Sequence, residues 1–116
     1  MFFDESMLLD LRLNILNKYV SKFVICESTF SHNGDKKKLN FNIKEFTKFK
    51  SKIEYIVLDE EPTNLRIINN NDFAELKESK TLDNALIREN FQRNQINKGL
   101  NDSKSEDIII ISDVDE

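Results

Sequence analysis

Four consecutive isoleucines run directly into a pair of aspartates in the stretch Asp107-Ile108-Ile109-Ile110-Ile111-Ser112-Asp113-Val114-Asp115-Glu116. Isoleucine is β-branched, and a strand that is apolar on both faces belongs in the middle of a parallel sheet. We therefore predict a buried strand over residues 107–112. Because ligands of open α/β sheets bind beyond the carboxyl ends of the strands, Asp113 and Asp115 mark a candidate binding site.

The spacing of the two aspartates favours a metal site. If the extended conformation continues past Ser112, the side chains of Asp113 and Asp115 point to the same side. Two carboxylates there can hold a hard divalent cation, Mn or Mg, which also binds diphosphate oxygens. Acidic pairs of this kind are common and usually solvated, so the position after the isoleucine run is what indicates metal binding.

Helical and strand-like segments alternate along the rest of the chain. Leu8, Leu11, Ile15 and Tyr19 recur at helical spacing, and Leu9, Leu13, Leu16 and Val20 widen the stripe, so the first helix should pack on a large surface. We expect helices from Asp4 or Ser6 to about Tyr19, at 43–49 and at 82–98, strands at 22–27 and 53–58, a long loop at 59–81, and Gly99 as a left-handed helix cap. The alternation predicts an α/β fold, a three-layer sandwich around a largely parallel sheet.

Composition narrows the class of protein. The 116 residues are enough for one small domain, and 39% hydrophobic with 33% charged residues is typical of a globular chain. The net charge of -4 argues against a nucleic-acid-binding surface. Cys26 is the single cysteine, which rules out an intrachain disulfide and favours a reducing, cytoplasmic setting. No apolar stretch approaches the roughly 18 residues of a membrane span, and the N-terminus is not typical of a secretory signal.

A band of polar residues is predicted on the third helix. Arg88 and Gln92 are four residues apart, as are Glu89 and Arg93, so the four side chains share one side of the helix. A solvated face with an ordinary Glu89–Arg93 ion pair explains this spacing. The same arginines could instead face a diphosphate, whose oxygens arginine binds with its fork of donors.

Five blocks of the sequence resemble the family-17 glycosyltransferases, the group that contains the β-1,4-mannosyl-glycoprotein β-1,4-N-acetylglucosaminyltransferase. They occur in the family's order along nearly the whole chain. The blocks are Phe3-Asp4-Glu5 with Leu8 to Leu13, Lys22 to Gly34, Lys52 to Val57, Arg88 to Arg93, and Ile108 to Glu116.

The resemblance implies a Rossmann-like, GT-A-type fold, of which residues 1–116 would form a partial, truncated nucleotide-sugar-binding domain. It implies metal-dependent, inverting transfer of N-acetylglucosamine from UDP-N-acetylglucosamine to a glycan acceptor. Asp113 and Asp115 would bind the divalent cation, and no catalytic base is assigned. The donor-binding residues that it implies are Glu27, His32, Arg88, Glu89, Gln92, Arg93 and Asp113.

The sequence also departs from the family pattern. The short strand that usually precedes the first block is missing, and Leu86 and Ile87 stand where a tryptophan is expected. Family members continue well past Asp-Val-Asp-Glu, where the acceptor-binding half should lie. We therefore expect this chain alone to be inactive. Animal members of the family are Golgi membrane proteins, but this sequence carries no anchor.

Two other functions remain open at this point. A phosphohydrolase of the haloacid-dehalogenase type also places two aspartates after an apolar strand, and a non-catalytic fragment would need no site at all. Single residues have competing roles too. Glu27 could bind donor or hydrogen-bond Arg12, and His32 could be a surface residue. Two charge clusters, at 36–38 and 59–61, are predicted to be solvated, although one lysine could reach a phosphate.

Overall fold

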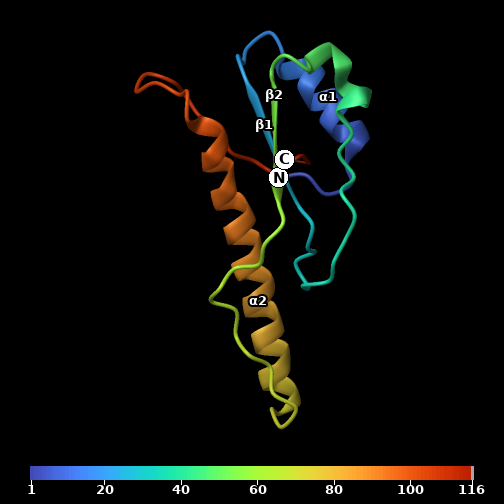
Figure 1. Cartoon of the computed structure of the whole chain (residues 1–116), viewed down its shortest axis with the longest axis vertical. Coiled ribbons are helices and arrows are strands. Elements are labelled where there is room, and N and C mark those ends of the chain that lie inside the picture. Colours follow the sequence, from blue (N-terminus) through green and yellow to red (C-terminus); the bar gives the residue numbers. More distant parts are fainter. Residues whose placement is uncertain (116) are drawn as a thin grey trace.

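The computed structural model describes residues 1–115 and contains two strands flanked by helices (Figure 1). In chain order the elements are α1 (Ser6–Leu16), β1 (Phe23–Ser28), the 3₁₀ helix η1 (Ile43–Phe49), β2 (Ile53–Leu58), α2 (Ala74–Gln95) and the 3₁₀ helix η2 (Ile96–Leu100). No helix within residues 1–115 is both long and apolar enough to cross a membrane.

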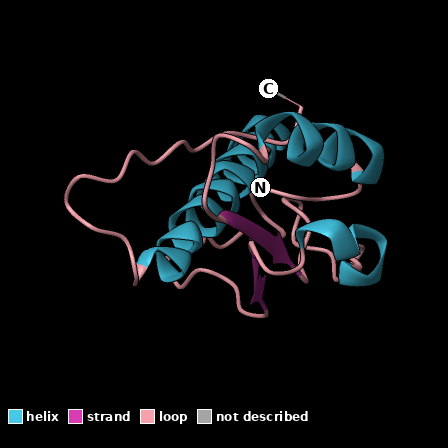
Figure 2. Ribbon diagram, turned by 90° about the horizontal axis from the view of Figure 1, so that it is seen from above, coloured by secondary structure: helices cyan, strands magenta, loops and turns pink. Residues whose placement is uncertain are grey.

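Strands β1 and β2 pair in parallel, with a register that runs from Phe23 opposite Ile53 to Ser28 opposite Leu58. Side chains of a strand alternate between its two faces. Phe23 and Ile25 face the core cluster with α1 and η1, while Val24 and Cys26 contact η2 and α2 on the other side. The strands therefore lie between two helical layers (Figures 1 and 2), as predicted for a three-layer α/β protein.

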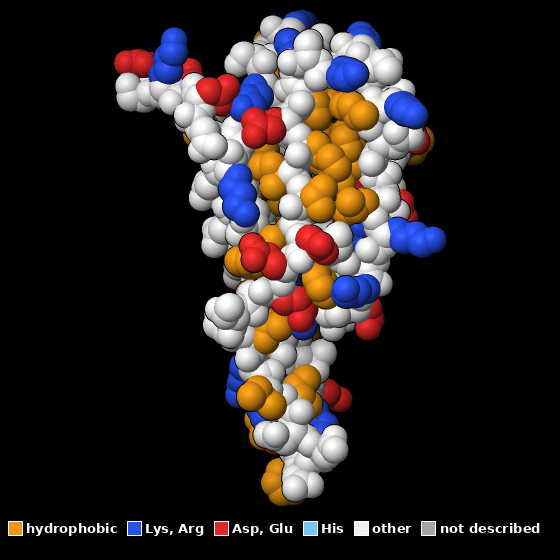
Figure 3. Space-filling view, in the orientation of Figure 1, with side chains coloured by type: hydrophobic (Ala, Val, Ile, Leu, Met, Phe, Trp, Pro, Cys, Tyr) orange, Lys and Arg blue, Asp and Glu red, His pale blue; other side chains and the backbone are white. Residues whose placement is uncertain are grey.

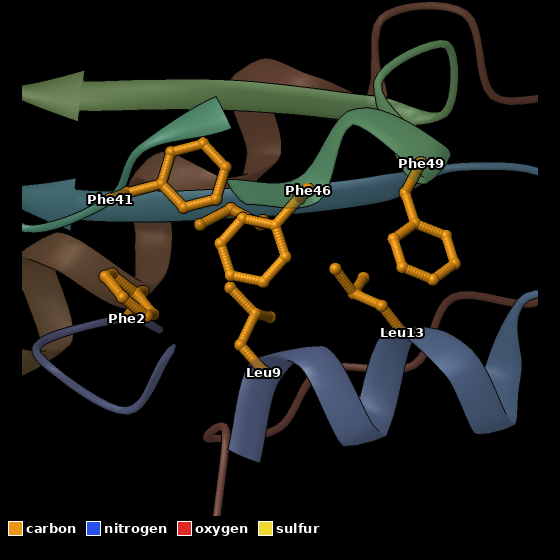
Figure 4. Packing of buried hydrophobic residues seen from close by; sticks show 7 residues of the cluster. Phe2, Leu9, Leu13, Phe41, Phe46 and Phe49 are labelled. Atoms are coloured by element: carbon orange, nitrogen blue, oxygen red, sulfur yellow. The ribbon is translucent and has the colours of Figure 1, made fainter. Parts of the chain in front are cut away.

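Aromatic rings fill the core on the η1 side of the sheet. Phe41 and Phe46 stack with ring centroids 5.4 Å apart, and Phe2 meets Phe41 edge to face at 5.8 Å. Leu9 and Leu13 of α1 point up into these rings (Figure 4). This packing holds the N-terminal segment, α1 and η1 together on one face of the sheet.

Helix α1 buries a narrower face than predicted. Leu9 and Leu13 are buried, and the helix ends at Leu16 rather than near Tyr19. The stripe expected to face the core is exposed instead, at Leu8, Leu11, Ile15 and Tyr19. A helix that is apolar nearly all round does not specify by periodicity which side meets the core. Exposed apolar side chains are also visible over the upper part of the molecule in Figure 3.

The predicted third strand, 107–112, is wrong. The segment is not paired with β1 or β2, and Ile108 is 91% exposed. The edge of β1 that it would use is partly occupied, because the carbonyl of Cys26 accepts hydrogen bonds from Phe2 N at 3.0 Å and Gln92 Nε2 at 3.3 Å. A parallel ladder cannot form where the backbone acceptor already has other donors, so the isoleucines pass outside the sheet.

Two boundaries near α2 also differ from the prediction. The helix begins at Ala74 rather than Leu82. The prediction missed its first turns because they are exposed and therefore lack an apolar period. They are held instead by polar contacts, such as the Lys80–Asp72 ion pair at 2.6 Å. Gly99 is not a left-handed cap, since Gly34 is the glycine with positive φ among the described residues. It serves close packing: a Cβ at Gly99 would lie 2.5 Å from Val24 Cγ1.

Gly99→Ala should destabilise the protein by about 1–3 kcal/mol, the usual cost of overpacking a filled site. Both methyl groups of Val24 lie within 2.7 Å of the new Cβ, so a rotation of that side chain cannot remove the clash. Urea unfolding measures the loss. The double variant Gly99→Ala, Val24→Ala should recover stability relative to Val24→Ala alone. If the two substitutions change the free energy of unfolding additively, Gly99 and Val24 do not constrain each other.

Candidate functional site

A cavity of about 550 Å³ opens beyond the carboxyl end of β1. Four parts of the chain surround it: the N-terminal segment, the loop that follows β1, the middle of α2 and the segment after Ser112. Its lining residues are Met1, Phe2, Phe3, Glu5, Phe30, Ser31, His32, Asn33, Lys37, Glu89, Gln92, Asp113, Val114 and Asp115. This is the edge of the sheet where the sequence predicts a ligand.

The cavity brings together five of the predicted site residues, from three separate parts of the chain. These five are His32, Glu89, Gln92, Asp113 and Asp115. Arg93 joins them indirectly, because its guanidinium lies 3.1 Å from the carboxylate of Asp113. Glu27 and Arg88 do not line the cavity, and both are engaged by other protein groups.

The carboxylate of Asp113 is surrounded by positive charge. Arg93 Nη2 lies 3.1 Å from its Oδ2 and 3.2 Å from Glu89 Oε1, so one guanidinium is shared by two acids. The N-terminal ammonium lies 3.6 Å from the other oxygen, Oδ1. This geometry confirms the predicted Glu89–Arg93 pair and adds Asp113 to it. Both carboxylate oxygens of Asp113 therefore face cationic groups of the protein itself.

Asp113 and Asp115 have the chemistry of a hard-cation site but not a complete ligand set. Asp113 is about one-third exposed and Asp115 is exposed, so both carboxylates can be reached from the cavity. Within residues 1–115, no three His, Cys, Asp or Glu side chains gather into a metal-binding group. Carboxylate oxygens are the ligands that hard cations such as Mg²⁺ and Mn²⁺ prefer, so these two side chains are the candidates for a cation site.

Glu27 is fully buried, and its carboxylate accepts hydrogen bonds from four donors of the protein. Oε1 accepts from Lys37 Nζ at 2.7 Å and Asn40 N at 2.8 Å, while Oε2 accepts from Phe41 N at 3.0 Å and Tyr55 OH at 2.8 Å. Burial alone would raise the pKa of Glu27, but these donors outweigh it and hold the pKa below the ordinary value. Arg12, one of the two alternatives that the sequence left open for Glu27, donates to the Ser112 hydroxyl.

Several residues of the site were missed by the sequence analysis. Lys37, from a run predicted to be solvated, neutralises Glu27. Burial and the Glu27 carboxylate raise the pKa of Tyr55, which keeps its hydroxyl a donor. Phe2, Phe3 and Glu5 also line the cavity. The first block of the family resemblance contains Phe3 and Glu5, so that block was a signal that could have found them.

The fold and cavity define an α/β protein with a cavity at the carboxyl end of a parallel strand. The comparisons identify the family: the model of glycosyltransferase family 17 matches residues 1–116. The chain belongs to this family of glycosyltransferases, whose members take a sugar donor and an acceptor. A search of the curated proteins and a search of the solved structures each found no match.

Glu27→Gln should destabilise the protein by about 3 kcal/mol, since removing one partner of a buried ion pair costs about 3–5 kcal/mol and the amide keeps some hydrogen bonds. Whichever way the new amide turned, its nitrogen would face two of the donors that now bind the Glu27 carboxylate. The folded-state pKa is lowered from 4.5, so the Glu27 contribution is fully present above pH 4.5 and is lost as pH falls through the folded value.

Urea unfolding at several pH values tests this. The wild-type advantage over Glu27→Gln should be largest near neutral pH and should shrink on acidification. Glu60→Gln makes the same chemical change at an exposed position and should alter stability little. An advantage that grows on acidification would contradict the assigned charge state of Glu27.

Proposed function

We propose that the cavity binds the nucleotide-sugar donor of the transfer reaction, UDP-N-acetylglucosamine, within a Rossmann-like, GT-A-type domain. The observation that carries the proposal is the convergence of Asp113, Asp115, Glu89 and His32 on one cavity in a chain of glycosyltransferase family 17. The donor identity, the glycan acceptor and inversion at the anomeric carbon come from the resemblance to the family. The volume of about 550 Å³ is in the range of small-molecule sites.

The lining of the cavity is mixed in chemistry, and this favours a ligand that is part ring and part anion. Three of its residues are aromatic, Phe2, Phe3 and Phe30, and Phe3 is the exposed one of the first two. Aromatic side chains stack on nucleobases. Lys37 Nζ lies 5.0 Å from the centre of the Phe3 ring, so positive charge borders that ring. We assign the uracil ring to Phe3 and Phe30.

Four acidic residues also line the cavity, which supports metal dependence. Its lining includes the carboxylates of Glu5, Glu89, Asp113 and Asp115. Backbone donors of Phe3 and Asp4 hold the pKa of Glu5 below its usual value, against the opposing effect of burial. A diphosphate would be repelled here unless a cation stood between it and the carboxylates. We assign that cation, Mn²⁺ or Mg²⁺, to Asp113 and Asp115.

A bound divalent cation would neutralise the negative charge that grows on the departing UDP. The chain's own part is to hold the donor. Gln92 is fixed in position, because its Nε2 donates to Cys26 O and its backbone carbonyl accepts from Cys26 Sγ. Arg93 keeps Asp113 oriented by bridging it to Glu89. No observation favours the phosphohydrolase alternative, since the family is one of glycosyltransferases.

Calorimetric titration with MnCl₂ and then UDP tests the proposal. Wild-type protein should bind UDP more tightly with Mn²⁺ than without it. Mutating an outer-shell partner of a metal site costs about 10–100-fold in affinity, so Asp113→Asn and Asp115→Asn, which remove direct ligands, should each weaken Mn²⁺-dependent UDP binding at least about tenfold.

Asp10→Asn is the matched control, because Asp10 is exposed on α1 and does not line the cavity. It should bind as the wild type does. UDP binding that is unchanged by both site substitutions would remove Asp113 and Asp115 from the donor site. No UDP binding under any condition would favour the non-catalytic alternative.

A further inference from the structure

One wall of the cavity is a tight loop, residues 30–36, here named the His32 loop. Phe30 and Lys36 form an antiparallel bridge at its base. Ser31 N donates to Asp35 O at 2.8 Å, and Gly34 N donates to Ser31 O at 2.9 Å. Phe30, Ser31, His32 and Asn33 line the cavity from this loop. The position of the loop therefore sets the width of the proposed donor site.

The guanidinium of Arg88 packs against the tip of this loop. Arg88 Nη1 donates to the carbonyl of His32 at 3.2 Å, and Nε donates to Glu61 Oε1 at 2.6 Å. The side chain of Arg88 is 14% exposed, so it is largely enclosed by these neighbours. A single planar group thus joins three parts of the chain: the His32 loop, the segment after β2 and helix α2.

Gly34 makes this close approach possible in two ways. Its φ is +93°, in the left-handed region that side chains other than glycine rarely adopt. A Cβ on Gly34 would also lie 2.5 Å from Arg88 Nη2 and 2.8 Å from Cζ. The space that a side chain would fill is therefore occupied by the guanidinium. The backbone conformation therefore requires glycine at this position, and the absence of a side chain leaves room for the guanidinium.

We propose that Arg88 is a positioning residue: it fixes the His32 loop against α2 and thereby shapes the donor cavity, without contacting the donor. This rests on the proposed function for the identity of the ligand. The fork of arginine is essential, because Nε and Nη1 bind different partners at the same time. A lysine has one nitrogen and cannot bridge Glu61 and His32 in this way.

The experiment compares Arg88→Lys and Gly34→Ala with wild-type protein in two assays. Hydrogen exchange follows the amides of Ser31, Gly34 and Asp35, whose bonds close the loop. Their exchange should accelerate about tenfold or more, as expected for loss of a hydrogen bond to a charged group. Calorimetry should show UDP-N-acetylglucosamine binding weakened several-fold, while Mn²⁺ binding at Asp113 and Asp115 is unchanged. That split would not follow from general destabilisation.

Arg66→Lys is the matched control, because Arg66 also pairs with a carboxylate, that of Asp83, but does not line the cavity. It should leave loop exchange and donor affinity unchanged. The inference is overturned if the three loop amides keep wild-type exchange in Arg88→Lys, or if they exchange faster while donor affinity stays at the wild-type level.

Failure of the proposed function has a different signature. In that case wild-type protein binds neither Mn²⁺ nor the nucleotide sugar, whereas loop exchange still responds to Arg88→Lys. If Gly34→Ala fails to fold, the milder Arg88→Lys variant decides, because the left-handed turn at Gly34 is left intact in it.

Discussion

The buried carboxylate of Glu27 is the interaction on which the rest of the site depends. A charge without access to water is costly unless donors replace its hydration, and here four donors do so. Three of them come from Lys37, Asn40 and Phe41, which follow the His32 loop, and one comes from Tyr55 of β2. Because Phe41 also belongs to the aromatic core, the carboxylate ties the exit of the loop to the sheet and to the packing beneath it.

Helix α2 supplies further contacts that hold the site together. Three of its residues, within two turns, contact three different parts of the chain. Arg88 binds the His32 loop, Gln92 binds the backbone of β1, and Arg93 binds the segment at Asp113. The loop is thus fixed at its exit by a buried acid surrounded by donors. At its tip the loop is fixed by the largely enclosed guanidinium of Arg88, which donates to Glu61 and to the carbonyl of His32. Phe30, Ser31, His32 and Asn33 of this loop line the cavity, which explains how a small two-stranded protein can present a defined wall.

Local patterns in the sequence predicted β1, β2, η1 and the existence of both α-helices, because the spacing of apolar residues indicates the type of local structure. They also placed Glu89, Gln92 and Arg93 on one side of α2. They did not predict the partners. Glu61 belongs to an acidic cluster that resembles a solvated loop, yet it binds Arg88. A partner twenty-seven residues away is set by how the loops cross, and no local spacing encodes that.

The failure at residues 107–112 has the same origin. An apolar run indicates that a segment favours burial, but not whether the neighbouring strand edge is free. Phe2 and Gln92 already use the carbonyl of Cys26, and they come from two distant parts of the chain, the N-terminal segment and α2.

The misplaced strand changes the reason why Asp113 lies at the cavity. The sequence-based argument relied on a laddered strand that delivers the aspartate to the carboxyl edge of the sheet. In the structure the isoleucines before it are exposed, and polar contacts hold the segment instead. Ser112 O accepts from the N-terminal ammonium at 3.2 Å, and Asp113 pairs with Arg93. Val114 packs against the core cluster. The geometry of this side of the site therefore depends on ion pairs and one apolar contact, so it should respond to salt more than the Glu27 side, where the charge is shielded from solvent.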